Sequence, residues 1–299
     1  MTVRKLNLKS KKMSKGSNII TLDIKGKCNE VAFLSDLHWD NPKCNRKQLK
    51  KDLDYCLKNK VPVFLNGDTL DLMQGKTDRR GSKSDILPEH NKGNYFDAVV
   101  ETAVEWFAPY AHIIFGVSYG NHETAPNKHH ESDLLRRWVR EMNLTHGSNI
   151  QLGGYSGWII IRQEIRKGVS VTYKGKYHHG LSAGGIVTRG IISLTRALEM
   201  YEDFDFFTMG HTHTSISDDV QRDIVVFNTK TKEYEVSKRN IHMMITGSYK
   251  DDYGDGSKGW AIERGMPTKQ IGGKLARFEV SQSNSCGLQK QITSYKFPL

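Results

Sequence analysis

Five short polar motifs hold the side chains most suited to chemistry. In chain order they are Asp36-Leu37-His38, Gly67-Asp68 with Asp71, Gly120-Asn121-His122-Glu123, His178-His179-Gly180 and Gly210-His211-Thr212-His213. Carboxylates, imidazoles and amide oxygens are ligands that divalent metals take up in proteins. Each motif alone is weak evidence for a metal site, because single histidines and Gly-Asp pairs are common in proteins. Five of them in one chain, most directly after an apolar run, predict a metal site.

The spacing inside two motifs strengthens this prediction. An Asp-x-His sequence just past a strand end leaves two ligands, Asp36 and His38, on one tight turn. His211 and His213 are separated by one residue. In an extended segment two such side chains point to the same side, because strand side chains alternate.

The first half of the chain alternates short apolar runs with amphipathic helices. The runs Glu30–Ser35, Val61–Leu65 and His112–Val117 are predicted strands, and each one ends at a polar motif. Apolar residues at helical spacing follow them over 49–57, 96–107 and 134–142. Such alternation predicts parallel strands with helical crossovers. Functional groups of such sheets gather beyond the C-terminal strand ends, where all three motifs lie.

The second half predicts a mainly antiparallel set of strands. Gly157–Glu164 and Val169–Tyr173 are expected to pair, and Ile191–Tyr201 to form a helix. Further strands are expected over 204–209, 224–228, 241–246 and 275–280. The polar stretches 74–93 and 251–258 are predicted loops near the site. We expect a basic N-terminal arm over 1–17 and one domain over 18–299.

The motif order D-x-H, G-D-x-x-D, G-N-H-[DE], H-G and G-H-x-H resembles the calcineurin-like metallophosphoesterase family. That family includes protein phosphatases and Mre11/SbcD-type nucleases, and the motifs span Asp36 to His213. The resemblance implies an α/β fold, a four-layer α/β/β/α sandwich of two mixed sheets flanked by helices. This agrees with the two-sheet arrangement predicted from the strand and helix pattern.

The resemblance also implies a pair of divalent metal ions and their ligands. It assigns Asp36, His38, Asp68 and His213 to one ion. It assigns Asn121, His179 and His211 to the second, with Asp68 shared by both. His179 is favoured over His178 because it directly precedes Gly180. Manganese is the expected metal, with iron, zinc, nickel and magnesium as alternatives, since mixed nitrogen and oxygen ligands suit all of these.

The expected chemistry is metal-dependent hydrolysis of a phosphoester. Two cations can hold a hydroxide between them for in-line attack on phosphorus. His122 resembles the family's catalytic histidine, either as general acid or as a donor to phosphate, and Asp71 is its expected partner; Asp71 could also simply start a helix. Leu72 stands where the protein-phosphatase branch has a phosphate-binding arginine. The candidates to bind phosphate in its place are three arginines that could equally be ordinary surface charges: Arg79, Arg80 and Arg189.

The excess of basic over acidic residues favours some substrate classes over others. Lys and Arg number 44 against 33 Asp and Glu, and the first 27 residues hold eight basic side chains and one acidic one. Such an excess favours polyanionic partners, so a phosphodiesterase or nuclease acting on nucleotides or nucleic acid is the leading hypothesis. The alternatives are a phosphomonoesterase on small molecules or phosphoproteins, and a non-catalytic scaffold or nucleic-acid-binding protein.

Composition also bears on where the protein works. The four cysteines form no C-x-x-C pair, and no secretory leader is recognisable at the N-terminus. A cytoplasmic location is therefore expected. No run of about 18 apolar residues exists, so no membrane partner is expected. The sequence makes no prediction about the oligomeric state.

Overall fold

The computed structural model describes residues 18–73, 81, 85–181, 187–228, 231–254, 256–257, 260–283 and 287–298. The predicted basic arm, Arg79 and Arg80 lie outside these residues, as do positions 74–80 and 82–84 of the loop predicted over 74–93. Within the described ranges no helix is long and apolar enough to cross a membrane.

The first of two six-stranded sheets carries the parallel strands predicted from the first half. Its order is β12-β11-β2-β3-β4-β5. The parallel members are β2 (Cys28–Leu34), β3 (Val63–Asn66), β4 (Ile114–Ser118) and β5 (Gln151–Leu152). On the other side of β2 the chain adds antiparallel β11 (Lys274–Ser283) and then β12 (Gly287–Lys296).

The second sheet has the order β1-β6-β7-β8-β10-β9 and is also mixed. Its strands are β1 (Ile19–Lys25), β6 (Ser156–Arg166), β7 (Val169–His178), β8 (Phe206–Met209), β9 (Ser215–Asn228) and β10 (Glu233–Thr246). The predicted β6–β7 pairing is confirmed and is antiparallel. By contrast, β8 runs parallel to both of its neighbours, so its C-terminal end faces the same way as that of β7.

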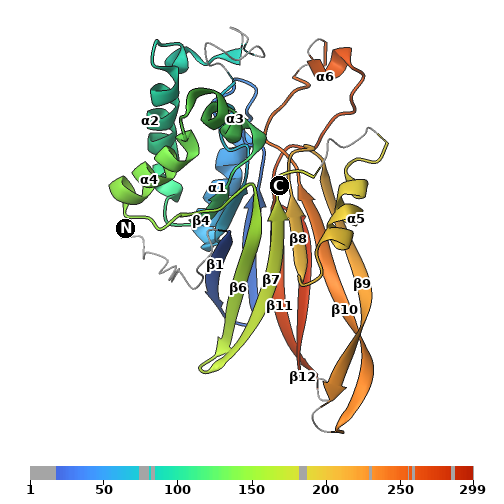
Figure 1. The fold of residues 1–299 in the computed structure, drawn as a ribbon. Helices are drawn as coiled ribbons and strands as arrows, with labels where there is room; N and C mark the ends of the chain where they lie inside the picture. The colour runs from blue at the N-terminus through green and yellow to red at the C-terminus, as the bar shows by residue number, and fades with distance from the viewer. Residues whose placement is uncertain are drawn as a thin grey trace.

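Helices cover the outer face of each sheet. Figure 1 shows α1 (Arg46–Asn59), α2 (Tyr95–Phe107), α3 (Asn121–His130) and α4 (Leu134–His146) on one side and α5 (Ile191–Met200) on the other. Shorter helical turns are η2 (Pro88–His90), η3 (Ala108–Tyr110) and α6 (Trp260–Glu263).

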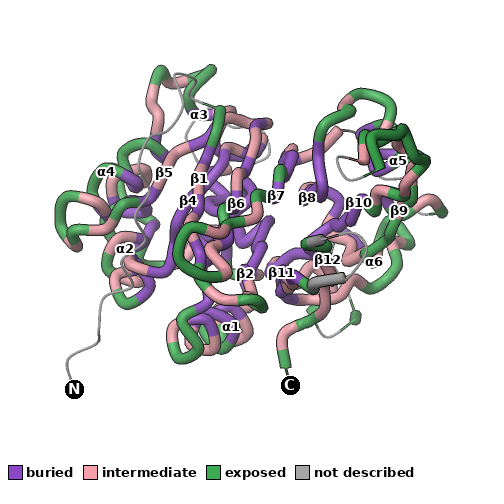
Figure 2. Tube along the Cα trace, turned by 90° about the horizontal axis from the view of Figure 1, so that it is seen from below, coloured by how far each residue is buried: buried purple, intermediate pink, exposed green. Residues whose placement is uncertain are grey.

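Three buried clusters lie between the layers. Strand residues alternate between them: Leu34 faces the helices, whereas Phe33 faces the second sheet. A third cluster, with Leu194 of α5 and Phe207 of β8, lies beneath α5. Figure 2 shows the buried residues concentrated along the strands. The predicted architecture of two mixed sheets flanked by helices is confirmed.

Several elements differ from the sequence expectation. The expected strand over 224–228 belongs to the much longer β9, whose first half is polar because most of that hairpin is solvent-accessible. β10 likewise begins eight residues before the predicted strand. β1 was not predicted, although Ile20, Leu22 and Ile24 alternate and are all buried.

Candidate metal centre

The turns after β2 and β3 are held side by side by backbone hydrogen bonds. Asp36 N donates to Gly67 O at 3.1 Å, and His38 N donates to Asp68 O at 3.0 Å. Because the two strands are parallel neighbours, their C-terminal ends meet at one edge of the sheet. This arrangement places the first two motifs in direct contact, as the sequence predicts.

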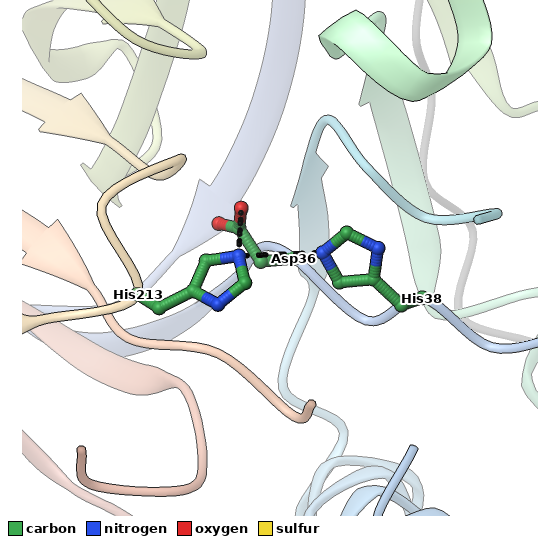
Figure 3. Close-up of side chains that lie close together, drawn as sticks. All are labelled: Asp36, His38 and His213. Carbon is green, nitrogen blue, oxygen red and sulfur yellow. Dashed lines mark hydrogen bonds and ion pairs between the residues drawn. The ribbon is translucent and has the colours of Figure 1, made fainter. Parts of the chain in front are cut away.

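Asp36, His38 and His213 form a first cluster (Figure 3). His213 Nε2 lies 3.2 Å from Asp36 Oδ1 and 3.3 Å from His38 Nε2. The side chains of Asp36 and His38 are almost fully buried, and that of His213 is 14% exposed. One ligand atom from each residue lies within 4.8 Å of the others, which is close enough to bind one ion.

Asp68, His179 and His211 form a second cluster of the same kind. His179 Nε2 lies 3.1 Å from Asp68 Oδ2, and both side chains are buried. Asp68 also groups with His38 of the first cluster and with His122, so it lies between the two clusters, where a ligand shared by two ions would lie. His178 belongs to neither cluster and instead packs its ring edge-on against Tyr155.

The donor set fits divalent cations. Asn121 begins α3, and its side-chain Oδ1 is buried with no hydrogen-bond partner among the described residues. His179 Nε2 is also buried and, despite its short distance to Asp68, makes no aligned hydrogen bond. Burying such atoms unpaired is costly. Coordination of a cation would satisfy both atoms.

Hydrogen bonds behind the imidazoles fix which nitrogen faces the clusters. His38 Nδ1 donates to Asp71 Oδ1 at 2.8 Å, and His179 Nδ1 donates to the backbone oxygen of Asn66 at 2.8 Å. Each bond places a proton on Nδ1, so Nε2 is the nitrogen that can offer a lone pair to a cation, in His179 once its Nε2 proton has been displaced. Outer hydrogen bonds of this type are common behind metal-binding histidines.

Five of the predicted ligands have left-handed backbone conformations. They are Asp36, His38, Asp68, His211 and His213, with φ between 46° and 67°. For a non-glycine residue this conformation costs on the order of 1–3 kcal/mol, and it concentrates at functional sites. His211 and His213 therefore converge through turned backbone, and the predicted extended segment is wrong.

Two motif glycines are required by close packing. A Cβ at Gly120 would overlap Asp68, and a Cβ at Gly210 would overlap Ser35 and Asp36. Any larger residue at either position would push a predicted ligand out of place. The glycines of the Gly-Asn-His and Gly-His patterns are therefore required because the turns that carry the predicted ligands pack closely together.

The carboxylates of both clusters are held in their charged form. Burial would raise the pKa of Asp36, but neighbouring His213 outweighs burial and lowers that pKa to about 2. Burial likewise opposes the charged form of His179, yet Asp68 raises its pKa to about 10. A cation bound here would displace the imidazole proton, so metal binding is expected to release protons.

Asp71 contacts His122, but mainly through its backbone. His122 Nδ1 donates to the Asp71 carbonyl oxygen at 2.7 Å, whereas the Asp71 carboxylate lies 3.5 Å away. That carboxylate accepts shorter hydrogen bonds from His38 Nδ1 and, at 2.9 Å, from Asn41 Nδ2. The geometry thus makes Asp71 first a support for His38. His122 Nε2 points toward Asp68, 3.8 Å from Oδ2.

Three charged residues around the clusters, two of them buried and one largely buried, are not among the sequence-predicted site residues. Glu123 accepts hydrogen bonds from the backbone N–H groups of Asp68, Leu70 and Gly120, between 2.8 and 3.1 Å. Asp40 accepts from the backbone of Asp71 and Leu72. The third is Lys250, which pairs with Asp71. Glu123 lies within a predicted motif, so the sequence could have indicated a role for it at the site. Asp40 and Lys250 belong to no motif, and the sequence does not indicate a role for them.

Arg189 lies beside the centre without contacting its ligands among the described hydrogen bonds and ion pairs. It is exposed, with left-handed backbone, and lines a cavity of about 240 Å³ together with Thr212 and Lys269. Its backbone oxygen accepts a hydrogen bond from Thr214 Oγ1 at 2.8 Å. A substrate-binding role for Arg189 remains a prediction.

Comparison with known proteins gives distant structural likenesses only. No family model and no curated protein sequence matches the chain. Chaetomium thermophilum Vps29 matches over 90% of this chain and 98% of its own, at 9% identity and a TM-score of 0.33. GAP50, described as the anchor in the inner membrane complex of Plasmodium, matches over 90% and 88%, at 11% identity and a TM-score of 0.42. Likenesses this weak identify neither a family nor an activity.

Proposed function

We propose that this protein is a phosphoesterase that depends on two divalent cations. The observation that carries the proposal is the convergence of two His/Asp clusters on Asp68. Asn121, which directly precedes His122, adds a buried side-chain oxygen with no hydrogen-bond partner in the described part of the chain. Asp36, His38 and His213 would hold one cation, and Asn121, His179 and His211 the other, with Asp68 shared. When bound, such a pair supplies Lewis acidity and a nucleophile at neutral pH.

The protein's own residues would orient the substrate and manage its protons. His122 is 9% exposed and faces the clusters through Nε2. Burial opposes its charged form, but the charges of Asp68 and Asp71 raise its pKa above the usual value. A protonated imidazole at this position suits a donor to the leaving oxygen. Its Nδ1 bond to the Asp71 carbonyl keeps the ring oriented.

Phosphodiesters of nucleotides or nucleic acid are the favoured substrates, with manganese as the favoured metal. The net charge of +11 supports a polyanionic substrate, because phosphate contacts release counterions. Monoesters are the alternative, since a two-cation centre serves either substrate. The family resemblance of the five motifs supports hydrolysis in both cases.

Hydrolysis of two model substrates tests the proposal. Protein reconstituted with manganese is assayed on bis-p-nitrophenyl phosphate and on p-nitrophenyl phosphate, with zinc, nickel, iron and magnesium in parallel. We expect turnover that chelator abolishes and metal restores, faster on the diester. Absence of turnover with every metal, on protein shown to bind two ions, would leave the scaffold alternative. Single-stranded DNA and RNA binding at two salt concentrations tests the polymer preference.

A further inference from the structure

Lys250 is a buried cation beside the candidate centre that the metal-ligand set does not use. Its side chain is 15% exposed, and its Nζ lies 3.3 Å from Asp71 Oδ1. The same oxygen accepts the hydrogen bond from His38 and lies 3.5 Å from His122 Nδ1. The ammonium group, a metal-binding histidine and the proposed proton donor therefore all adjoin one carboxylate oxygen.

The backbone that carries Lys250 is fixed to the first ligand turn. Ser248 Oγ and Tyr249 N both donate to the Asp36 carbonyl oxygen at 3.0 Å. Tyr249 is fully buried, and its hydroxyl donates to Asp52 at 2.7 Å. Lys250 is thus held at a set distance from the metal ligands by the fold.

The hydrogen-bond donors of the Lys250 ammonium group are only partly satisfied by the described residues. The group has three donors, and Asp71 is its one hydrogen-bond partner in the described part of the chain, although the charges of Asp252 and Asp85 also act on it at longer range. At 3.3 Å this contact is longer than a charge-assisted hydrogen bond usually is, and Asp71 already accepts from His38 and Asn41. A largely buried cation whose donors are not all used within the protein, beside the proposed phosphoester site, is suited to bind an anionic substrate.

We propose that Lys250 binds a non-bridging phosphoryl oxygen of the substrate; this assignment rests on the proposed function. Leu72, which directly follows Asp71 in the chain, is 2% exposed and apolar, so it supplies no cation beside Asp71. Lys250 instead brings positive charge to the neighbouring Asp71 from the segment that follows β10. It supplements the cations as a point charge on the transferred group.

Binding of inorganic phosphate tests Lys250 without relying on turnover. Wild type, Lys250→Met and Lys250→Arg are loaded with manganese, and phosphate affinity is measured by calorimetry beside metal content. We expect Lys250→Met to bind two ions but to lose about 10- to 100-fold in phosphate affinity, as loss of a charged hydrogen bond predicts. Lys250→Arg should recover most of that loss. Lys290→Met is the control, because Lys290 pairs with Asp205 at 2.7 Å, away from the clusters.

The outcomes separate this assignment from the proposed function. Unchanged phosphate affinity in a folded, metal-loaded Lys250→Met variant would overturn it, as would loss of metal in that variant. Lys250→Gln provides a second test if the methionine variant does not fold, which circular dichroism checks. If the wild type binds metal and phosphate but hydrolyses no ester, the proposed phosphoesterase function would be contradicted. The role of Lys250 in phosphate binding would still stand.

Discussion

Asp71 Oδ1 accepts a hydrogen bond from His38 Nδ1 at 2.8 Å, and both side chains are buried. The contact fixes the tautomer of His38 and turns its Nε2 toward His213. Asp71→Asn would replace a charged acceptor by a neutral amide, and should weaken metal affinity about 10- to 100-fold. Competition with a fluorescent chelator measures this. Asp97→Asn, which breaks an exposed ion pair with Arg137, should leave the affinity unchanged.

Asp68 lies between the two clusters, so its removal should affect both cations. Asp68→Ala is expected to lower metal content and to reduce turnover by at least about 100-fold, more than loss of an outer contact. Adding manganese should raise the melting temperature of the wild type, because binding stabilises the folded state, and should not raise that of the variant. His211→Ala should behave in the same way. Wild-type turnover in either variant would refute the site.

His122 is proposed to donate a proton and not to bind metal. His122→Ala should retain two ions and slow hydrolysis by roughly 10²- to 10⁴-fold. The loss should grow as the leaving group becomes more basic, because poor leaving groups need the proton most. A series of substituted phenyl esters measures this. His129→Ala, at the exposed end of α3, is the matched control. Metal loss in His122→Ala would show that His122 is a ligand.

Glu123 links the turns that carry Asp68 and Asn121 through three backbone N–H groups. Glu123→Gln places an amide NH₂ where an acceptor is needed. Leaving a buried donor unsatisfied should lower the free energy of unfolding by about 2–3 kcal/mol. Urea denaturation measures this, with Glu141→Gln on the exposed surface of α4 expected to change it by less than about 0.5 kcal/mol. Equal stabilities would contradict the linking role.

Lys274 gives a prediction for pH. It is 5% exposed on β11, and burial lowers its pKa to about 8. Between that value and the unfolded value of 10.5 the unfolded chain binds more protons than the folded one, so stability contributed by this group rises with pH. Wild type should therefore gain stability relative to Lys274→Met between pH 7 and about 10. Parallel pH profiles of the two proteins would contradict the shift.

The sequence predicts the architecture because the required periodicities are local. Strands β2, β3 and β4 are short apolar runs that end at polar motifs, and the helices between them show apolar residues at helical spacing. Only the end of β9, over 224–228, is predicted, because its first half is polar and packs little. β1 was missed although its alternation was present.

The candidate site is predictable where a motif carries it and not elsewhere. The six His and Asp residues of the two clusters converge as the sequence predicts: Asp36, His38, Asp68, His179, His211 and His213. Asn121 begins α3, and its buried side-chain oxygen has no hydrogen-bond partner within the described ranges. Lys250 belongs to no motif and reaches Asp71 only through tertiary packing of the segment after β10. The left-handed backbone at Asp36 and His213 follows from packed turns, which no residue type specifies.

The bond from Tyr249 N to the Asp36 carbonyl joins residues 213 positions apart in the chain, and His213 lies 177 positions after Asp36. On a translating ribosome, the helix-covered first half can begin to fold while these later residues are still unmade. The cluster of Asp36, His38 and His213 cannot close until His213 has left the exit tunnel, and the bonds from Ser248 and Tyr249 to the Asp36 turn form later still. Domains generally fold as units once they have been synthesised. A nascent chain therefore has no complete set of candidate metal ligands until late in its synthesis.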